Sequence, residues 1–331
     1  TLKSKGHLFP IKDGKWFIQR SNLGNTGADF YIADNPKYGV TMTYHLSNNY
    51  ETKSEKRKKS EKRLNQKLLN VPFPGYDNLD KEKNEIPAYV KISIEDENGN
   101  IIRHIKERAS KGVHRITWDL RHMYKGSLND SNNENRLKGP IVKPGKYSAS
   151  MYLVENGLTT KLSEKKSFKL TPIYESTLKG TSFEKYNKYM DDYFKVYNDI
   201  EFIEHKLKTV GEKIKSLKIA IDNTPRDTDE LVLGFQNLKN SFLSIKRKVL
   251  GNESKMEIGE KNPPSLYNRI RVASQGLSSS YGPTKLHLES LDIARQMNVE
   301  IKFLFDNKMS KELNSLENKI KTSGGPVIIE D

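Results

Sequence analysis

Apolar and polar residues alternate with a period of two along much of the chain between residues 30 and 170. Short segments show this alternation, each with one apolar face, and they lie at residues 40–46, 90–95, 115–120, 147–153 and, more weakly, 168–170. Strands of this length, with turn residues between them, are typical of an antiparallel β-sandwich. We therefore expect residues 29–172 to form an immunoglobulin-like or fibronectin-like β-sandwich.

Two Asn-Gly pairs mark turns between apolar segments of this region. The first pair is Asn98-Gly99 and the second is Asn156-Gly157. Both central residues of a type I′ turn need a positive φ, which Asn and Gly adopt more readily than other residues. We therefore expect a type I′ hairpin at each pair.

Two polar segments interrupt the sandwich pattern. Residues 48–87 begin as a charged helical stretch and end in a Pro-rich connector, and residues 125–138 form a Ser/Asn-rich loop. Neither segment has a regular apolar face to bury. We expect both to be insertions in the sandwich, and the second to be mobile.

Beyond Pro172 the apolar period changes to 3.6 residues, which is typical of helices that bury one face. The predicted helices span residues 183–221, 228–251, 265–277 and 288–320, with a break in the last helix near residues 306–310. The connections between them are short, which favours antiparallel neighbours. We therefore expect residues 173–331 to form a long antiparallel bundle of three to four helices.

The composition limits the class of protein. Apolar residues make up 34% of the 331 residues and charged residues 30%, so the two predicted cores are slim. No apolar run approaches the roughly 18 residues of a membrane helix, which excludes a transmembrane span. Cysteine is absent, which excludes disulfides, thiolate nucleophiles and cysteine-ligated metals and fits a secreted bacterial protein.

A net charge of +15 is partly concentrated in the first insertion. Residues 51–67 contain eight basic and three acidic side chains, which gives 8 − 3 = +5. Glu55 and Lys59 have the spacing of an ion pair on one helix face. Aromatic residues are not interleaved with these cations, so a solvated helix is favoured over a nucleic-acid site, with polyanion binding as the alternative.

The motifs of common catalytic and metal sites are missing from the sequence. The histidines have no HExxH spacing and are interpreted as isolated surface or edge side chains: His7, His45, His104, His114, His122, His205 and His287. Residues 96–100 resemble the opening of a calcium loop, but the glycine comes two places early, so a hairpin turn is favoured. No phosphate-binding loop or Gly-x-Ser-x-Gly elbow occurs. We therefore predict no catalytic, cofactor-binding or metal-ligating residue, and no cofactor.

The two tryptophans lead to different predictions. Trp118 alternates in phase with Ile116 and Leu120, so we expect it in the core of the sandwich. Trp16 lies beside Phe17 outside any alternating segment, so we expect its contact partner to lie outside this chain. The tyrosines of the first long helix lie on its apolar stripe and are expected in the core.

Several motifs together resemble a known family. In order, they are Leu8-Phe9-Pro10, Ala33-Asp34-Asn35-Pro36-Lys37-Tyr38-Gly39, Val113-His114-Arg115-Ile116-Thr117-Trp118-Asp119-Leu120-Arg121, Gly139-Pro140, Pro144-Gly145-Lys146-Tyr147, Pro263-Pro264-Ser265 and Gly282-Pro283-Thr284. This series resembles the C-terminal region of bacterial sortilin-like BNR-repeat β-propeller proteins, often labelled glycosyl hydrolases. Residues 91–170 are also similar to the immunoglobulin-like domain of flagellar hook-cap proteins.

This resemblance implies a parent protein with a β-propeller upstream of Thr1, against which residues 1–28 would pack. It also implies secretion or display at a bacterial cell surface, with the periplasm as an alternative. None of these motifs contains a residue that is catalytic in either family, and the hydrolase label does not define a site. The partner expected for this chain is therefore the propeller or another surface protein, with a glycan as an alternative.

Three hypotheses about function follow from these observations. The first is a non-catalytic structural or protein-interaction region of such a propeller protein. The second is an accessory part of a glycoside hydrolase whose active site lies on the propeller. The third is a module that binds carbohydrate or another polyanion through the basic insertion and exposed aromatic residues.

Overall fold

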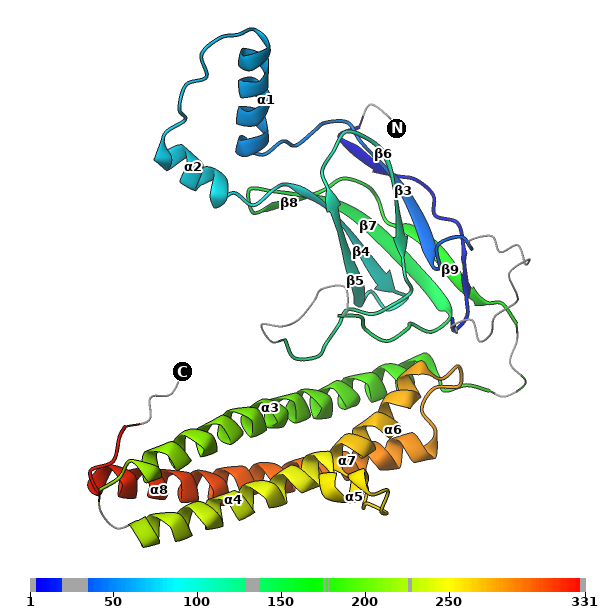
Figure 1. Ribbon diagram of the computed structural model, residues 1–331. Coiled ribbons are helices and arrows are strands. Elements are labelled where there is room, and N and C mark those ends of the chain that lie inside the picture. The colour runs from blue at the N-terminus through cyan, green and yellow to red at the C-terminus, as the bar shows by residue number, and fades with distance from the viewer. Residues whose placement is uncertain are drawn as a thin grey trace, which may run out of the picture. The chain divides into compact units, whose positions relative to one another are not determined.

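The computed structural model describes residues 4–19, 35–128, 137–174, 177, 179–225 and 228–327. The chain divides into two compact units. The first comprises residues 1–124 and 135–175 and contains the strands, whereas the second comprises residues 125–134 and 176–331 and contains the long helices (Figure 1). Much of the Ser/Asn-rich loop expected to be mobile, residues 129–136, lies outside the described residues.

The strands of the first unit form two sheets. The three-stranded sheet has the order β1-β3-β6, with β1 Gly6–Leu8, β3 Val40–Leu46 and β6 Gly112–Trp118. The larger sheet has the order β2-β9-β7-β4-β5, with β8 also paired to β7. Its strands are β2 Gly14–Trp16, β4 Tyr89–Asp96, β5 Ile101–Arg108, β7 Gly145–Glu155, β8 Leu158–Lys161 and β9 Lys166–Pro172.

The predicted alternation is confirmed in these strands. The apolar residues of β3, β4 and β7 that share one face are buried: Val40, Met42, Tyr44, Leu46, Val90, Ile92, Ile94, Tyr147, Ala149, Met151 and Leu153. The strict period of two lets a strand bury one face because successive side chains point to opposite sides. β4 and β7 are neighbours in register, with Ile92 opposite Met151.

The expectation of purely antiparallel sheets is wrong at one edge. β2 pairs with β9 in parallel, with Gly14 opposite Leu170 and Trp16 opposite Pro172. Parallel neighbours cannot be joined by a tight turn, and these two strands are separated by most of the first unit. The larger sheet is therefore mixed.

Trp118 lies between the two sheets, as its alternation predicts. Its side chain is 1% exposed. The indole makes edge contacts with Tyr147 and Phe168 of the larger sheet, at ring-centroid distances of 5.4 and 6.1 Å. Such edge-to-face geometry is favoured by the aromatic quadrupoles. One side chain of β6 thus joins the core faces of both sheets.

The prediction that the contact partner of Trp16 lies outside this chain is wrong, because Trp16 is buried by residues of the chain itself. It is 7% exposed. Its indole nitrogen donates a hydrogen bond of 2.6 Å to the carbonyl of Val142. The pairing of β2 with β9 brings it there, and a pairing between distant segments leaves no local trace in the sequence. The described part of residues 1–28 contributes β1 and β2 to the sheets, and packing of this segment on a propeller stays a prediction.

The two predicted hairpins exist, but only one has the predicted turn. Asn156 and Gly157 both have positive φ, 51° and 78°, as a type I′ turn requires. At the first hairpin only Gly99 has a positive φ, 81°, and its N–H donates to the Asp96 carbonyl. The type I′ prediction is wrong there because the Asp96 carboxylate accepts N–H bonds from Asn98 and Asn100 and selects another turn.

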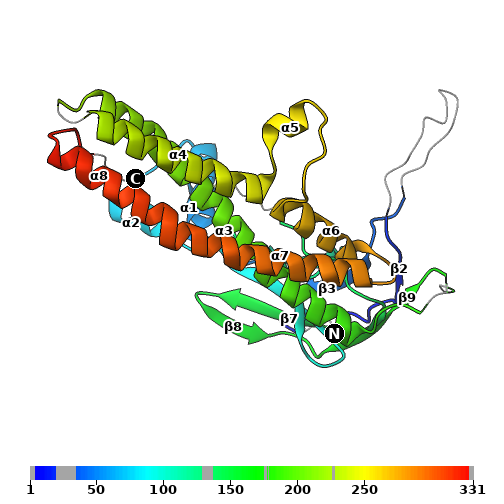
Figure 2. The same ribbon diagram turned by 90° about the horizontal axis from the view of Figure 1, so that it is seen from below.

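The helical unit contains helices close to the predicted positions (Figure 2). They are α3 Phe183–Asp222, α4 Thr228–Leu250, α6 Leu266–Ser278, α7 Lys285–Leu304 and α8 Ser310–Thr322, and one short helix that was not predicted, α5 Glu253–Glu257, follows α4. The break expected in the last helix is confirmed as a π-helical turn, η2 Phe305–Met309. Ser182 and Ser265 begin α3 and α6 by accepting backbone N–H bonds, which is the usual role of an N-cap serine.

Buried tyrosines link α3 to α6 in this unit. The hydroxyl of Tyr186 donates to the Leu277 carbonyl at 3.0 Å, and that of Tyr189 donates to the Ala273 carbonyl at 2.7 Å. Both side chains are buried in a core that α3, α4, α6, α7, η2 and α8 share. The prediction that the tyrosines of the first long helix are core residues is confirmed for Tyr186. Their hydroxyls reach the main chain, so no buried hydroxyl is left without a partner at these two sites.

We predict that Gly39→Ala destabilises the first unit far more than Gly157→Ala. Both glycines have positive φ, 123° and 78°. A Cβ at Gly39 would lie 1.8 Å from the Trp118 carbonyl oxygen, whereas nothing lies within 4 Å of a Cβ at Gly157. We expect a loss of about 1–2 kcal/mol for Gly157→Ala from backbone strain alone, and about 3 kcal/mol or more for Gly39→Ala.

Urea unfolding followed by tryptophan fluorescence measures this difference, because both tryptophans of the chain belong to the first unit. Equal midpoints for the two variants would show that the approach of Gly39 to Trp118 does not matter for stability.

Candidate functional site

The structure gives no support to a metal site among the residues that it describes. In those residues no group of three or more His, Asp or Glu side chains converges. The interpretation of the histidines as surface or edge residues is wrong for His45, His122 and His287, which are buried. His287 has a structural role, because its Nδ1 accepts the Thr284 backbone N–H at 3.1 Å at the start of α7.

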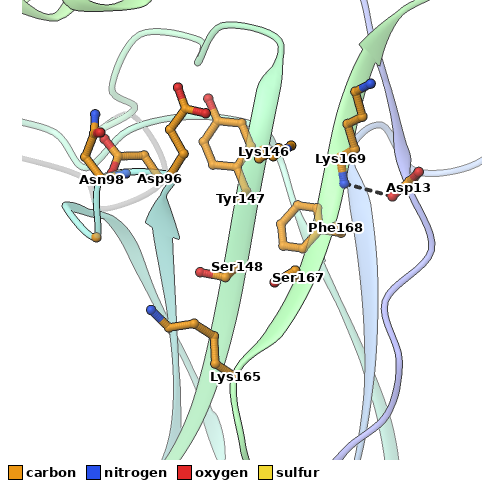
Figure 3. A pocket seen from close by; sticks show the side chains of 12 residues that line it. Asp13, Asp96, Asn98, Lys146, Tyr147, Ser148, Lys165, Ser167, Phe168 and Lys169 are labelled. Atoms are coloured by element: carbon orange, nitrogen blue, oxygen red, sulfur yellow. Dashed lines mark hydrogen bonds between the residues drawn. The ribbon is translucent and has the colours of Figure 1, made fainter.

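A hollow of about 630 Å³ lies at one end of the larger sheet (Figure 3). Lysines, acidic residues and the edges of two aromatic rings line it, from the β4–β5 turn and from β7, β9 and the segment before β2: Asp13, Asp96, Glu97, Lys146, Tyr147, Lys165, Phe168 and Lys169. Lys165 pairs with Glu95 at 2.6 Å, and that hydrogen bond raises the pKa of the lysine. Charged side chains of both signs therefore make up half of the residues that line the hollow.

Two of the three acidic residues in the hollow, Asp96 and Asp13, are already used by the fold. The Asp96 carboxylate accepts the N–H groups of Asn98 and Asn100 and is buried. The Asp13 carboxylate accepts the backbone N–H of Lys169 at 2.8 Å, as Figure 3 shows. General acid–base catalysis needs a group within reach of a reacting atom. These carboxylates instead hold a turn and a strand edge in place.

A second groove, of about 580 Å³, lies between α3 and α4 in the helical unit. Leu207, Phe242 and Leu250 form its apolar part. Gly211 allows the close approach of the helices, since a Cβ there would lie 3.3 Å from the Phe242 ring. Burial raises the pKa of Glu204 on its rim. A single half-buried carboxyl at an apolar groove does not define a catalytic pair.

The first insertion forms a two-helix arm that projects from the sheets (Figure 1). We call residues 48–87 the arm; it contains α1 Lys53–Gln66, as predicted, and a further helix, α2 Tyr76–Lys83. Neither helix has a buried residue. The arm helices therefore contribute nothing to the core of the first unit.

One arginine holds the two helices of the arm together. Arg57 donates from Nε and Nη2 to both carboxylate oxygens of Glu82, at 2.8 and 2.9 Å, and from Nη1 to Glu61 at 2.6 Å. A bidentate pair of this kind fixes orientation as well as distance. The Arg57 hydrogen bonds lower the pKa of the Glu82 carboxyl.

The predicted ion pair between Glu55 and Lys59 is wrong. Glu55 instead pairs with Arg108 of β5 and completes a capping box with Thr52, while Lys59 pairs with Glu51. The Glu55 carboxylate accepts the Thr52 N–H at the start of α1, because the first N–H groups of a helix lack intrahelical partners. Within the described part of the chain, the other lysines and Arg63 of residues 51–67 form no ion pair: Lys53, Lys56, Lys58, Lys62, Arg63 and Lys67.

The connector between α1 and α2 exposes large apolar side chains. We call residues 68–76 the arm tip. Leu68 is 95% exposed, Leu69 54%, Phe73 64% and Tyr76 77%. The rings of Phe73 and Tyr76 contact each other edge to face, with 5.0 Å between the ring centroids. Sequence analysis missed this feature, and the available signal was a run of apolar and proline residues directly after a basic helix.

The main chain holds Leu68 in an unusual conformation. Its φ is 54°, the left-handed region that favours Gly or Asn. The N–H of Leu68 donates to the Asn65 carbonyl and that of Leu69 to the Leu64 carbonyl, both at 3.0 Å. This is a Schellman motif that ends α1. It points a leucine side chain into solvent at the end of a basic helix.

Comparisons with known proteins give no family for the chain. No family model matches the sequence, and no curated protein matches it either. Among the residues that the structure describes, no helix is both long and apolar enough to cross a membrane. The arm, with its exposed tip and unpaired cations, is therefore the strongest candidate for a functional surface.

We predict that acid loosens the arm. The Glu82 pKa is lowered from 4.5, so the pairing with Arg57 is fully present above that value and is lost as the pH falls through the lowered pKa. With nitroxide labels on Ser60→Cys and Asn84→Cys, we expect a narrow distance distribution at pH 7 that broadens as the pH falls through the lowered pKa of Glu82.

Glu82→Gln is the matched control, because it removes the charge and leaves the Arg57–Glu61 pair; it should broaden the distribution at every pH. A Glu82→Gln distribution as narrow as that of wild type at pH 7 would contradict the proposed clamp.

Proposed function

We propose that this chain is a non-catalytic structural and interaction region of a secreted or cell-surface protein. The observation that carries the proposal is a contrast between two surfaces. Two carboxylates of the hollow, those of Asp96 and Asp13, hold the fold through their bonds to backbone N–H groups. The arm helices bury nothing and the arm tip exposes large apolar side chains, which is typical of a surface that meets a partner.

We further propose that the sheets form an immunoglobulin-like sandwich and that the helices form an antiparallel bundle. Trp118, placed between the two sheets, supports the first assignment, because a tryptophan between packed sheets is a feature of such sandwiches. The shared core of α3, α4, α7 and α8 supports the second. The ordered motif series supports a sortilin-like propeller parent, in which this chain would present the arm beside the propeller.

Binding of a glycan or another polyanion is a second candidate function. It is favoured by basic side chains of α1 and its C-cap that form no ion pair with any residue that the structure describes, among them Lys62, Arg63 and Lys67. Cations without a protein partner are available to an anionic polymer. The hypothesis of an accessory hydrolase part stays a prediction without such an observation.

We expect the purified chain to show no hydrolysis of aryl glycosides above the buffer rate, because Asp13 and Asp96 of the hollow are committed to main-chain hydrogen bonds and glycoside hydrolysis needs a pair of carboxyl groups, which Glu97 alone does not supply. The measurement is chromophore release at several pH values, with Asp13→Asn and Asp96→Asn as comparison variants. Hydrolysis by the wild-type chain that either substitution abolishes, in a variant with wild-type circular dichroism, would overturn the proposal.

We also predict that the arm is dispensable for folding. The Lys53 N–H donates to the Glu85 carboxylate at 2.6 Å, so the two ends of the arm lie side by side. A short Gly-Ser linker in place of residues 53–84 should leave the urea midpoint of the first unit within about 0.5 kcal/mol of wild type, since no core contact is lost. A loss of several kcal/mol would show that the arm is part of the fold.

A further inference from the structure

We propose that the arm docks this protein on an anionic lipid surface. In this arrangement Leu68, Leu69, Phe73 and Tyr76 enter the headgroup region, and the cations of α1 contact lipid phosphates. The inference rests on the proposed interaction function and names its partner. It concerns a peripheral contact with one face of a bilayer.

The apolar side chains of the arm tip have the composition of an interfacial segment. Leucine and phenylalanine supply apolar surface that is stabilised by leaving water, and tyrosine has an apolar body with a polar end, which suits the boundary of a bilayer. These side chains follow one another within residues 68–76. A lipid surface can accept them together because it requires no matching shape.

The main-chain conformation of Leu68 also supports docking on a lipid surface. Its positive φ is unfavourable for leucine, and its side chain is almost fully exposed. Inside this chain the leucine therefore gains nothing from packing at this position. Removal of this exposed side chain from water at a lipid surface would offset the backbone strain.

The charge next to the tip is complementary to an anionic surface. Lys62, Arg63 and Lys67 lie at the C-terminal end of α1, are exposed, and form no ion pair within the described part of the chain. Asp77 and Asp80 of α2 oppose this charge in part. Basic side chains beside an apolar segment attract a protein to anionic lipids.

The extent of the apolar surface favours a lipid over a protein partner. A stable protein interface buries about 800 Å² on each partner and involves about 20–30 residues a side. The arm tip supplies four exposed large apolar side chains, far fewer than such an interface needs, and the two helices beside it bury nothing. Arg57 and Glu82 hold these helices together, so the tip is presented on a stiff support.

The test is flotation of the full chain with vesicles of phosphatidylcholine alone or mixed with phosphatidylglycerol. The tip variant is Leu68→Ser with Phe73→Ser, and the charge variant is Lys62→Gln with Arg63→Gln and Lys67→Gln. The matched control is Val113→Ser with Leu158→Ser, which changes two exposed apolar side chains outside the arm. Circular dichroism verifies that each variant is folded.

We expect wild type and the matched control to bind anionic vesicles at least about tenfold more tightly than neutral ones. The tip variant should lose at least about tenfold in binding to anionic vesicles, because its side chains no longer enter the bilayer. The charge variant should lose a similar factor and show a weaker dependence on salt.

Three outcomes would overturn the inference. The first is a failure of wild type to bind either vesicle. The second is a tip variant that binds anionic vesicles as wild type does, while the charge variant is weakened. That result would indicate a surface for polyanions in general, and wild type and the tip variant would then bind heparin equally well. The third is tip-dependent self-association in sedimentation equilibrium without vesicle binding, which would indicate a second copy as partner. None of these outcomes affects the non-catalytic role, which is tested separately by the glycoside assay.

Discussion

The position of Trp118 between the two sheets is the constraint on which the first unit depends. Its indole contacts Tyr147 and Phe168 from the opposite sheet, and its nitrogen donates to the Arg121 carbonyl at 3.0 Å. The main chain of Trp118 approaches Gly39 so closely that no side chain fits there. Gly39, which has no Cβ and directly precedes β3, is thus required for Trp118 to occupy the core from β6, the strand that pairs with β3.

The arm is organised in the opposite way. Its helices have no buried side chain. The Arg57–Glu82 pair holds the two helices together, and the Glu55–Arg108 pair connects α1 to β5. Exposed ion pairs contribute little to stability when they stand alone, but a bidentate arginine fixes geometry. The arm therefore has a defined shape without a core, and its apolar residues remain at the surface.

Regular apolar patterns allowed most of the fold to be predicted. β3, β4, β7 and the long helix α3 follow from their alternation or stripe, because each buries one continuous face. β1 and β2 are three residues each, too short to show a period. The arm tip and the Arg57–Glu82 pair escaped prediction for other reasons. An exposed apolar run has no period, and residues 25 positions apart have no spacing rule.

Leu68 links the local chemistry of the chain to its proposed role. A helix that ends in a Schellman motif is most stable with glycine at the left-handed position, since any Cβ there adds strain. Leucine adds that strain, and its exposed side chain gains no packing in the folded arm to compensate for it. Removal of the side chain from water at a partner surface would offset the strain. In the proposed docking the stabilising contact of this residue is therefore made outside the chain, and the cations before it select an anionic surface as the place.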